Sequence, residues 1–133
     1  VTVLLLESNV EVISIDNLDN SRIEVLEGIK AITGNEPVFE LLDLKDKDKI
    51  QDLFKKHTDI DGVIHFAAHK AVGESIEDPL KYYKNNIGGL LNLLESLCKL
   101  SIPLIFSSSC TVYGQASKLP IEENNPLKPP SSP

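Results

Sequence analysis

Polar and small residues follow four short apolar runs of this sequence, at positions where they could bind a nucleotide. They are Asp16 with Asn17, Asp43, the segment Phe66–Lys70, and Ser107–Ser109 with Thr111. A carboxylate at the end of a strand can accept hydrogen bonds from ribose hydroxyls, which favours NAD over its 2′-phosphate. Small residues let a backbone approach a pyrophosphate, a lysine can pair with a phosphate, and hydroxyls can bind a sugar. Together these positions indicate a nucleotide site.

Each position also has a simpler interpretation. An Asp-Asn pair such as Asp16 and Asn17 often starts a turn, and no glycine-rich turn precedes it here. Asp43 could be an exposed loop acid, Lys70 a solvated lysine, and a serine run is common in loops. The functional interpretation depends on the positions occurring together.

Two of the three histidines have the spacing H-x-x-x-H, namely His65 and His69. That spacing places two imidazoles on one face of a helix and suits a metal. Here it spans an expected strand and its exit loop, so we expect no metal site. His65 is expected to satisfy a hydrogen bond in or near the core.

Hydrophobic periodicity predicts strands and helices that alternate along the chain. Strands are predicted at residues 10–16, 38–42, 62–66 and 102–106, and helices at 2–8, 23–32, 46–56 and from a Ser75 cap, with Pro79 in the first turns, to Cys98. Alternation of this kind gives right-handed βαβ units and a parallel sheet. We therefore expect an α/β fold with a Rossmann-like, doubly wound sheet. The four strand exits should converge on one cleft, because ligands bind at the carboxyl ends of such strands.

Composition restricts the class of protein. The 133 residues fit one domain, and an apolar fraction of 41% with 25% charged residues is typical of a globular protein. The net charge of −7 argues against nucleic-acid or anionic-membrane partners. Cys98 and Cys110 are too few for a disulfide framework, so a reducing, cytoplasmic setting is expected, with Cys98 in the core. Val1–Leu6 lacks a basic leader, and no apolar run approaches the ~20 residues of a membrane span.

Four segments, in order and at natural spacing, resemble one known family. They are IDNLDNS (Ile15–Ser21), HFAAHKAVGES (His65–Ser75), PLKYYKNN (Pro79–Asn86) and FSSSCTVYG (Phe106–Gly114). They resemble UDP-galactose (UDP-glucose) 4-epimerases of the NAD-dependent epimerase/dehydratase group of extended short-chain dehydrogenases. The resemblance runs from Thr2 to about Leu127, and KAVGES is its most specific segment. It implies that residues 1–127 form a partial NAD-binding Rossmann domain and residues 128–133 a Pro/Ser-rich tail.

The resemblance also implies roles for individual residues. It places the adenosine ribose on Asp16, Asn17, Leu18, Asn20 and Ser21, and the adenine beside Asp43 and Leu44. The pyrophosphate and the nicotinamide side would lie on Phe66, Ala67, Ala68, His69, Lys70 and Asn85. The UDP-sugar substrate would be bound by Lys70, Ser109, Cys110 and Thr111. Ser109 would bind the hydroxyl at the reacting sugar carbon. Family members usually have Gly at Ala68, Leu at His69 and Ala at Cys110. They are commonly homodimers.

The family reaction oxidises the sugar C4 hydroxyl with bound NAD and returns the hydride to the opposite face. Its base is a tyrosine with a lysine four residues later, because residues four apart share a helix face. No such pair occurs here: Tyr113 and Lys118 are five apart, and Tyr82 and Tyr83 precede Asn86 and Ile87 by four. The resemblance puts the catalytic tyrosine a few residues after Leu127. We therefore expect these 133 residues alone to be inactive on UDP-sugars.

The resemblance further implies a strand and a G-x-x-G-x-x-G turn before the position of Val1. The chain has no methionine, so we expect it to be a truncated piece. The absent strand would lie in the middle of the sheet, and we expect the piece not to fold stably alone. Two alternatives remain open, a degenerate nucleotide-binding module without catalysis and another nucleotide-sugar epimerase or dehydratase.

Overall fold

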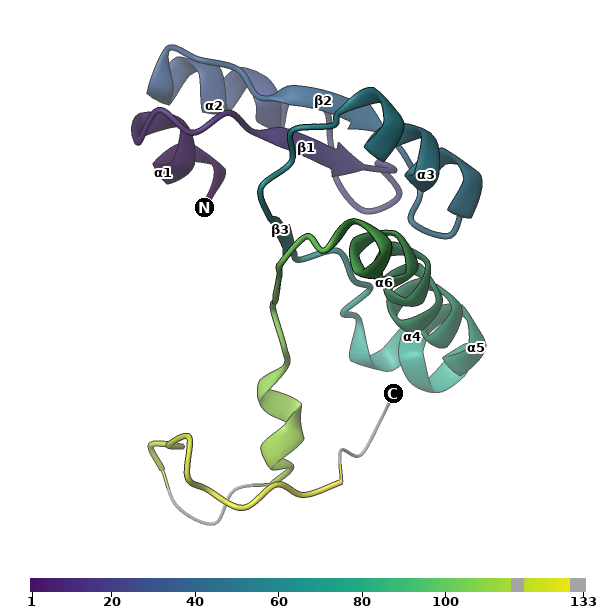
Figure 1. The fold of residues 1–133 in the computed structure, drawn as a ribbon. Helices are drawn as coiled ribbons and strands as arrows, with labels where there is room; N and C mark the ends of the chain where they lie inside the picture. Colours follow the sequence, from purple (N-terminus) through teal and green to yellow (C-terminus); the bar gives the residue numbers. More distant parts are fainter. Residues whose placement is uncertain (116–118, 130–133) are drawn as a thin grey trace.

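A computed structural model describes residues 1–115 and 119–129 of the chain (Figure 1). Parallel strands alternate with helices, as the sequence predicts for an α/β fold. In chain order the elements are α1 (Thr2–Glu7), β1 (Ile13–Asp16), α2 (Val25–Thr33), β2 (Val38–Leu41), α3 (Lys47–Lys56), β3 (Val63–His65), α4 (Val72–Glu77), α5 (Pro79–Tyr82), the π-helix η1 (Tyr83–Gly88), α6 (Gly89–Leu100), β4 (Leu104–Phe106) and the 3₁₀-helix η2 (Cys110–Tyr113).

Helix α3 shows how local sequence and packing combine. Asp46 caps its first turn by accepting a hydrogen bond from the Lys49 N–H at 3.2 Å, which satisfies one of the donors that a helix start leaves unpaired. Its apolar side chains lie at helical spacing on one face and pack against α6. The core of the molecule consists of Leu42, Ile50, Leu53, Phe54, Leu93 and Leu97.

The four strands form two separate parallel pairs. In one pair Ile13 lies opposite Val38, and in the other Val63 lies opposite Leu104. Within the described residues no strand joins β1 to β3. The pairs fit the two halves of a doubly wound sheet whose central strand is missing. Apolar side chains beside this gap, among them Ile64 and Phe66, are consequently exposed.

The prediction of one long helix capped by Ser75 is wrong. A helix, α4, already begins at Val72, and Ser75 lies buried inside it with its Oγ donating to the Val72 carbonyl oxygen at 2.8 Å. The chain leaves helical geometry at Asp78, which caps a second helix by accepting from the Lys81 N–H at 3.1 Å. Pro79 occupies the first position of that helix, where its missing N–H costs nothing.

The helical segment that follows has two apolar faces. Leu93 and Leu97 face the core, as expected from their spacing. The expectation that Cys98 is also in the core is wrong. Cys98 directly follows Leu97, so its side chain points in a different direction from the helix axis, and it is exposed. A second face carries side chains that are between 48% and 65% exposed, and we call it the outer apolar face: Leu80, Tyr83, Ile87 and Leu91.

The chain after Gly114 forms no helix or strand over residues 119–129, in agreement with its loop-like sequence. It lies apart from the strand pairs (Figure 1) and is held to η2 by the Lys128 N–H, which donates to the Val112 carbonyl oxygen at 2.9 Å. Most of the Pro/Ser-rich tail predicted at 128–133 lies outside the described residues. No helix in the described parts of the chain has the length and apolar character needed to cross a membrane.

Candidate functional site

Asp16 ends β1 with a carboxylate held in one orientation. Its Oδ1 accepts two hydrogen bonds, from the Leu18 N–H and from the Ser21 hydroxyl, each at 2.7 Å. Leu18 adopts a φ of 59°, a left-handed conformation that turns its N–H back toward Asp16. Among residues 1–115 and 119–129, no hydrogen bond reaches Oδ2. The loop therefore presents an oriented carboxylate oxygen at a strand exit, the acceptor that a ribose hydroxyl requires.

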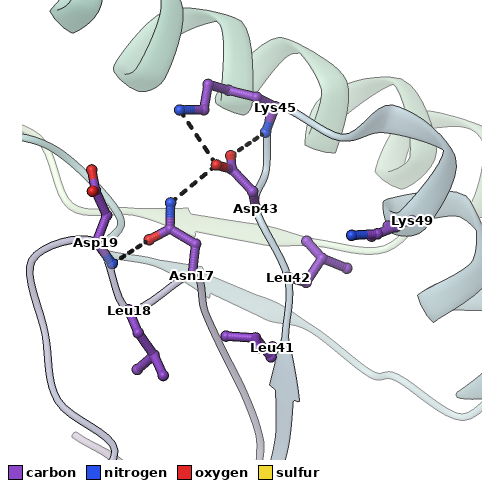
Figure 2. Close-up of a pocket in the computed structure, with 8 residues that line it drawn as sticks. All are labelled: Asn17, Leu18, Asp19, Leu41, Leu42, Asp43, Lys45 and Lys49. Carbon is purple, nitrogen blue, oxygen red and sulfur yellow. Dashed lines mark hydrogen bonds and ion pairs between the residues drawn. The ribbon is translucent and has the colours of Figure 1, made fainter.

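Asp43 follows β2 and joins the exits of the first strand pair. Its Oδ2 accepts a hydrogen bond from Asn17 Nδ2 at 3.1 Å and lies 3.3 Å from Lys45 Nζ, while Oδ1 accepts from the Lys45 N–H at 2.8 Å (Figure 2). Partial burial opposes ionisation, but these partners outweigh it and hold the pKa of Asp43 below its ordinary value. Asp43 is thus ionised at neutral pH and bound to the β1 loop.

Two adjoining hollows lie at these strand exits, and we call them together the cleft. The larger hollow, of about 560 Å³, is lined by Asn17, Leu18, Asp19, Leu41, Leu42, Asp43, Lys45 and Lys49 (Figure 2). The smaller hollow, of about 70 Å³, is lined by Ile15, Asp16, Asn17, Asn20, Leu42, Asp43, Leu44, Ala67, Ala68, His69 and Asn85. The hollows share Asn17, Leu42 and Asp43. The structure thus brings the exits of β1, β2 and β3 together at one site.

The π-helix η1 holds the loop that follows β3 in place. Asn86 Oδ1 accepts from the His69 N–H at 2.8 Å, and Asn86 Nδ2 donates to the His69 carbonyl oxygen at 3.0 Å. Asn85 Nδ2 donates to Asn86 Oδ1 at 3.0 Å. Single π-helical turns often mark functional sites because they redirect side chains. Here the turn places two consecutive amides against the loop that contributes Ala67 and Ala68 to the cleft.

Sequence reasoning missed several residues of the cleft and its support. The sequence singles out Asn86 only as the last residue of the segment Pro79–Asn86, although its side chain holds the His69 N–H and carbonyl oxygen. Lys45 and Lys49 line the larger hollow, and Asp19 lies at its edge. The sequence could have indicated Lys45 as a cleft residue, because it lies two residues after the acid that ends a strand. The role of Asn86 depends on a π-helix, which no residue pattern predicts.

The expectation that all four strand exits share one cleft is wrong for the fourth. Ser109, Cys110 and Thr111 do not line either hollow, and neither do Phe66 and Lys70. Ser109 instead caps η2: its Oγ lies 2.8 Å from Thr111 Oγ1 and accepts from the Thr111 N–H at 3.3 Å. In Figure 1 the segment after β4 runs away from the β1–β2 pair.

The described tyrosines do not offer a base. Tyr82 is buried, and its hydroxyl donates to Glu74 Oε2 at 2.7 Å. Burial, followed by this hydrogen bond and the Glu74 charge, raises the pKa of Tyr82, which is the wrong direction for a group that must lose a proton near neutral pH. Tyr113 lies in η2, outside the cleft. Tyr83 belongs to the outer apolar face and does not line either hollow.

The two histidines of the H-x-x-x-H pattern do not form a pair. His65 is buried against the ring of Phe106, with ring centroids 5.6 Å apart, and burial lowers its pKa. His69 lies at the cleft and faces Asp19. Within the described residues, no group of three or more His, Cys, Asp or Glu side chains is arranged to hold a metal ion.

Comparisons with known proteins agree with this geometry. The family model described as GDP-mannose 4,6 dehydratase matches residues 1–133. The UDP-glucose 4-epimerase of Neisseria meningitidis serogroup A is 45% identical over 132 residues, which cover 98% of this chain and 39% of that protein. The Bacillus subtilis UDP-glucose 4-epimerase is 45% identical over 124 residues, 92% of this chain and 36% of that protein. The chain thus spans well under half the length of these relatives.

Solved structures of such enzymes have the same fold. The UDP-glucose 4-epimerase of Bifidobacterium longum, in complex with NAD+ and UDP, superposes with a TM-score of 0.89 at 42% identity, covering 95% of this chain and 38% of that one. The enzyme of Stenotrophomonas maltophila, with bound NAD and formylated UDP-arabinopyranose, gives 0.87 at 40% identity, with 95% and 38% covered. From its fold, its cleft and these matches, the chain belongs to the nucleotide-sugar epimerase and dehydratase family represented by the GDP-mannose 4,6 dehydratase model, and is similar within it to UDP-glucose 4-epimerases.

Proposed function

We propose that residues 1–127 form the NAD-binding part of an enzyme that interconverts UDP-galactose and UDP-glucose in galactose metabolism. The observation that carries this proposal is the oriented carboxylate of Asp16 at the mouth of a cleft shared by three strand exits. Asp16 Oδ2 is available to ribose hydroxyls, whereas a 2′-phosphate would meet the Asp16 charge and be repelled. The relatives with bound NAD support the same cofactor.

The rest of the cleft suits the other parts of NAD. Asn17, Leu18, Asn20 and Ser21 surround the ribose position, and Asp43 with Leu44 borders the space for the adenine. Ala67 and Ala68 are small enough for a close backbone approach, and Asn85 supplies an amide beside them. Bound NAD supplies the hydride acceptor for a sugar C4 hydroxyl, and this chain supplies the groups that orient it.

The UDP-sugar would be held in part by Lys70, Ser109, Cys110 and Thr111. These residues follow β3 and β4, the second strand pair, and lie outside the cleft described above. We propose that they reach the reacting sugar once a strand between β1 and β3 joins the two pairs. In that arrangement the Ser109 hydroxyl, which is hydrogen-bonded to Thr111 in this structure, contacts the sugar hydroxyl.

We also propose that the enzyme is a homodimer of the cytoplasm. The outer apolar face of the α5–α6 segment supports the dimer, because a helix with apolar side chains on two faces is normally covered on both. A second copy of the chain can cover such a face through a symmetric contact in which both copies use the same residues. Cys98 and Cys110 are free thiols, which agrees with a reducing compartment.

The test uses the enzyme in its complete length, incubated with UDP-galactose while UDP-glucose is measured. Asp16→Ala should cause the enzyme to lose its bound NAD and its turnover. The variant lacks the hydrogen bonds between the ribose hydroxyls and a charged carboxylate, which contribute about 1.5–3 kcal/mol each. Asp61→Ala, an exposed acid at the opposite end of β3, is the matched control and should keep both. Retained NAD without epimerisation would favour a dehydratase or a non-catalytic binding module instead.

A further inference from the structure

The loop Asp43–Lys45 borders both hollows of the cleft. Asp43 lines both of them, Leu44 lines the smaller one and Lys45 the larger one. Hydrogen bonds also tie the loop to itself, because the Lys45 N–H donates to Asp43 Oδ1 at 2.8 Å (Figure 2) and the Asp46 N–H donates to the Asp43 carbonyl oxygen at 2.9 Å. The direction of the Asp43 carboxylate therefore depends on where the backbone of this loop lies.

One side chain of α6 holds this backbone. Asn92 Nδ2 donates to the Leu44 carbonyl oxygen at 3.0 Å and to the Lys45 carbonyl oxygen at 3.2 Å. An amide nitrogen carries two hydrogens, so one can serve each carbonyl oxygen, and both lengths lie in the usual range for such bonds. Two consecutive peptide groups held by one amide have little freedom to rotate.

Close packing supports these two hydrogen bonds. Gly89 is buried and lies three residues before Asn92, on the same face of α6. A Cβ at Gly89 would lie 3.0 Å from the Leu44 Cβ. Leu44 itself packs against the core, which includes Leu93 and Leu97 of α6. Helix α6 and the loop are thus in direct contact, and no further strand can lie between them.

The chemistry of the Asp43 carboxylate makes its direction important. Within the described residues, Oδ2 is bound by Asn17 Nδ2 and Lys45 Nζ, whereas Oδ1 accepts only the Lys45 N–H. A carboxylate oxygen can accept two hydrogen bonds and donates none, so Oδ1 can accept one more from a ligand. Adenine has one exocyclic donor, the amino group at C6. A carboxylate directed at that group favours adenine over a purine that lacks it.

We propose that Asn92 is a positioning residue that sets the direction of the Asp43 carboxylate by holding the carbonyl oxygens of Leu44 and Lys45, and so increases the preference of the site for adenine. The inference rests on the proposed function, because it takes the adenine of NAD as the base beside Asp43. Asn92 lines neither hollow and acts through the backbone of the loop. Its loss should weaken recognition of the base and leave the Asp16 carboxylate in place.

The experiment uses the enzyme in its complete length, freed of NAD, and two nucleotides. One is NAD, and the other is its analogue in which purine replaces adenine, so that only the 6-amino group is missing. Asn92→Asp keeps the size of the side chain but places a carboxylate oxygen where the amide donated. The NAD dissociation constant should rise about threefold to tenfold, as expected for the loss of one neutral hydrogen bond, and that of the purine analogue less than about twofold. Asn92→Leu removes the donor without adding charge and should show the same pattern.

Two controls separate this role from a general loosening of the fold. Asn35→Asp makes the same exchange in the exposed loop between α2 and β2 and should change neither constant. Glu95→Gln removes the ion pair between α6 and Lys47 and should leave the ratio of the two constants unchanged. If the Asn92 variants weaken both nucleotides by the same factor, or weaken neither, the inference is overturned, since a merely structural role does not distinguish the two bases.

A second measurement needs no nucleotide. In the NAD-free enzyme the amides of Lys45 and Asp46, which donate within the loop, should exchange hydrogen faster in Asn92→Asp than in Asn35→Asp. Equal exchange would also overturn the inference. An enzyme that neither carries NAD nor acts on UDP-galactose would refute the proposed function, while the exchange measurement still decides whether Asn92 holds the loop.

Discussion

Asn17 Nδ2 donates a hydrogen bond of 3.1 Å to Asp43 Oδ2 across 26 residues of sequence. The bond joins the exits of two parallel strands, β1 and β2, at the side of the cleft where the adenosine is proposed to bind (Figure 2). It fixes the distance between the β1 exit, where Asp16 is proposed to accept the ribose, and Asp43, which is proposed to lie beside the adenine. The cleft is thus a product of strand pairing and of side chains that tie the strand ends together.

Asp43→Ala should destabilise the enzyme in its complete length by about 1–2 kcal/mol at pH 7, because Asn17 and the Lys45 N–H lose a charged acceptor. The folded state lowers the pKa of Asp43 below the ordinary value of 3.8. The stabilisation is therefore present above that value and is lost as pH falls through the folded pKa. Urea unfolding of variant and parent should differ at pH 7 and converge as the pH falls below the folded pKa of Asp43. Asp61→Ala, with its carboxylate outside the cleft, should show no such convergence.

Gly89→Ala should destabilise the enzyme, whereas Gly28→Ala should stabilise it. A Cβ at Gly89 would lie 3.0 Å from the Leu44 Cβ, in the segment that Asn92 Nδ2 holds by donating to the Leu44 carbonyl oxygen at 3.0 Å. Overpacking of this kind costs about 1–3 kcal/mol. A Cβ at Gly28 of α2 meets no atom within 4 Å, so the gain in helix propensity of about 1 kcal/mol is realised there. Thermal unfolding of both variants provides the measurement, and a stable Gly89→Ala enzyme would show that Leu44 can move away.

Ile87→Glu together with Leu91→Glu should convert the proposed dimer to a monomer. Both side chains belong to the outer apolar face and are about half exposed, so the charges can be solvated in a single chain but not between two. Light scattering after size exclusion gives the mass directly. Lys84→Glu, on the same helical segment but at a polar position, is the control and should remain dimeric. A double variant that stays dimeric would place the dimer contact elsewhere.

The isolated 133-residue polypeptide should show no cooperative thermal transition and should not turn over UDP-galactose. In the part of the chain that the structure describes, the two strand pairs share no strand, and Ile64, Phe66 and Ile105 are exposed at their surfaces. Domain stability is only about 5–15 kcal/mol, which leaves little margin for this loss of buried area. Calorimetry and dye binding to exposed apolar surface test the first part. A sharp, high transition would contradict it.

Much of the fold follows from local sequence. The predicted strands are one to three residues longer than the observed ones. Helix α3 begins after the Asp46 cap, as its acids and lysines indicate. Helix α2 ends at Gly34, whose φ of 73° suits a residue without a side chain. The break at Asp78 was not foreseen, because Pro79 is equally compatible with the first turn of a new helix and with the early turns of a longer one.

By itself, the sequence determined the order of the elements, the parallel strands and the acids that end β1 and β2, because periodicity and strand-end chemistry are local properties. Only the tertiary structure decided which strand exits meet. It brought Asp16, Asp43 and His69 to one cleft and left Ser109 outside it, since that depends on which strands pair and on where a π-helix places Asn86. Side-chain direction and the spacing of separate loops are set by packing across the whole molecule, which no short segment encodes.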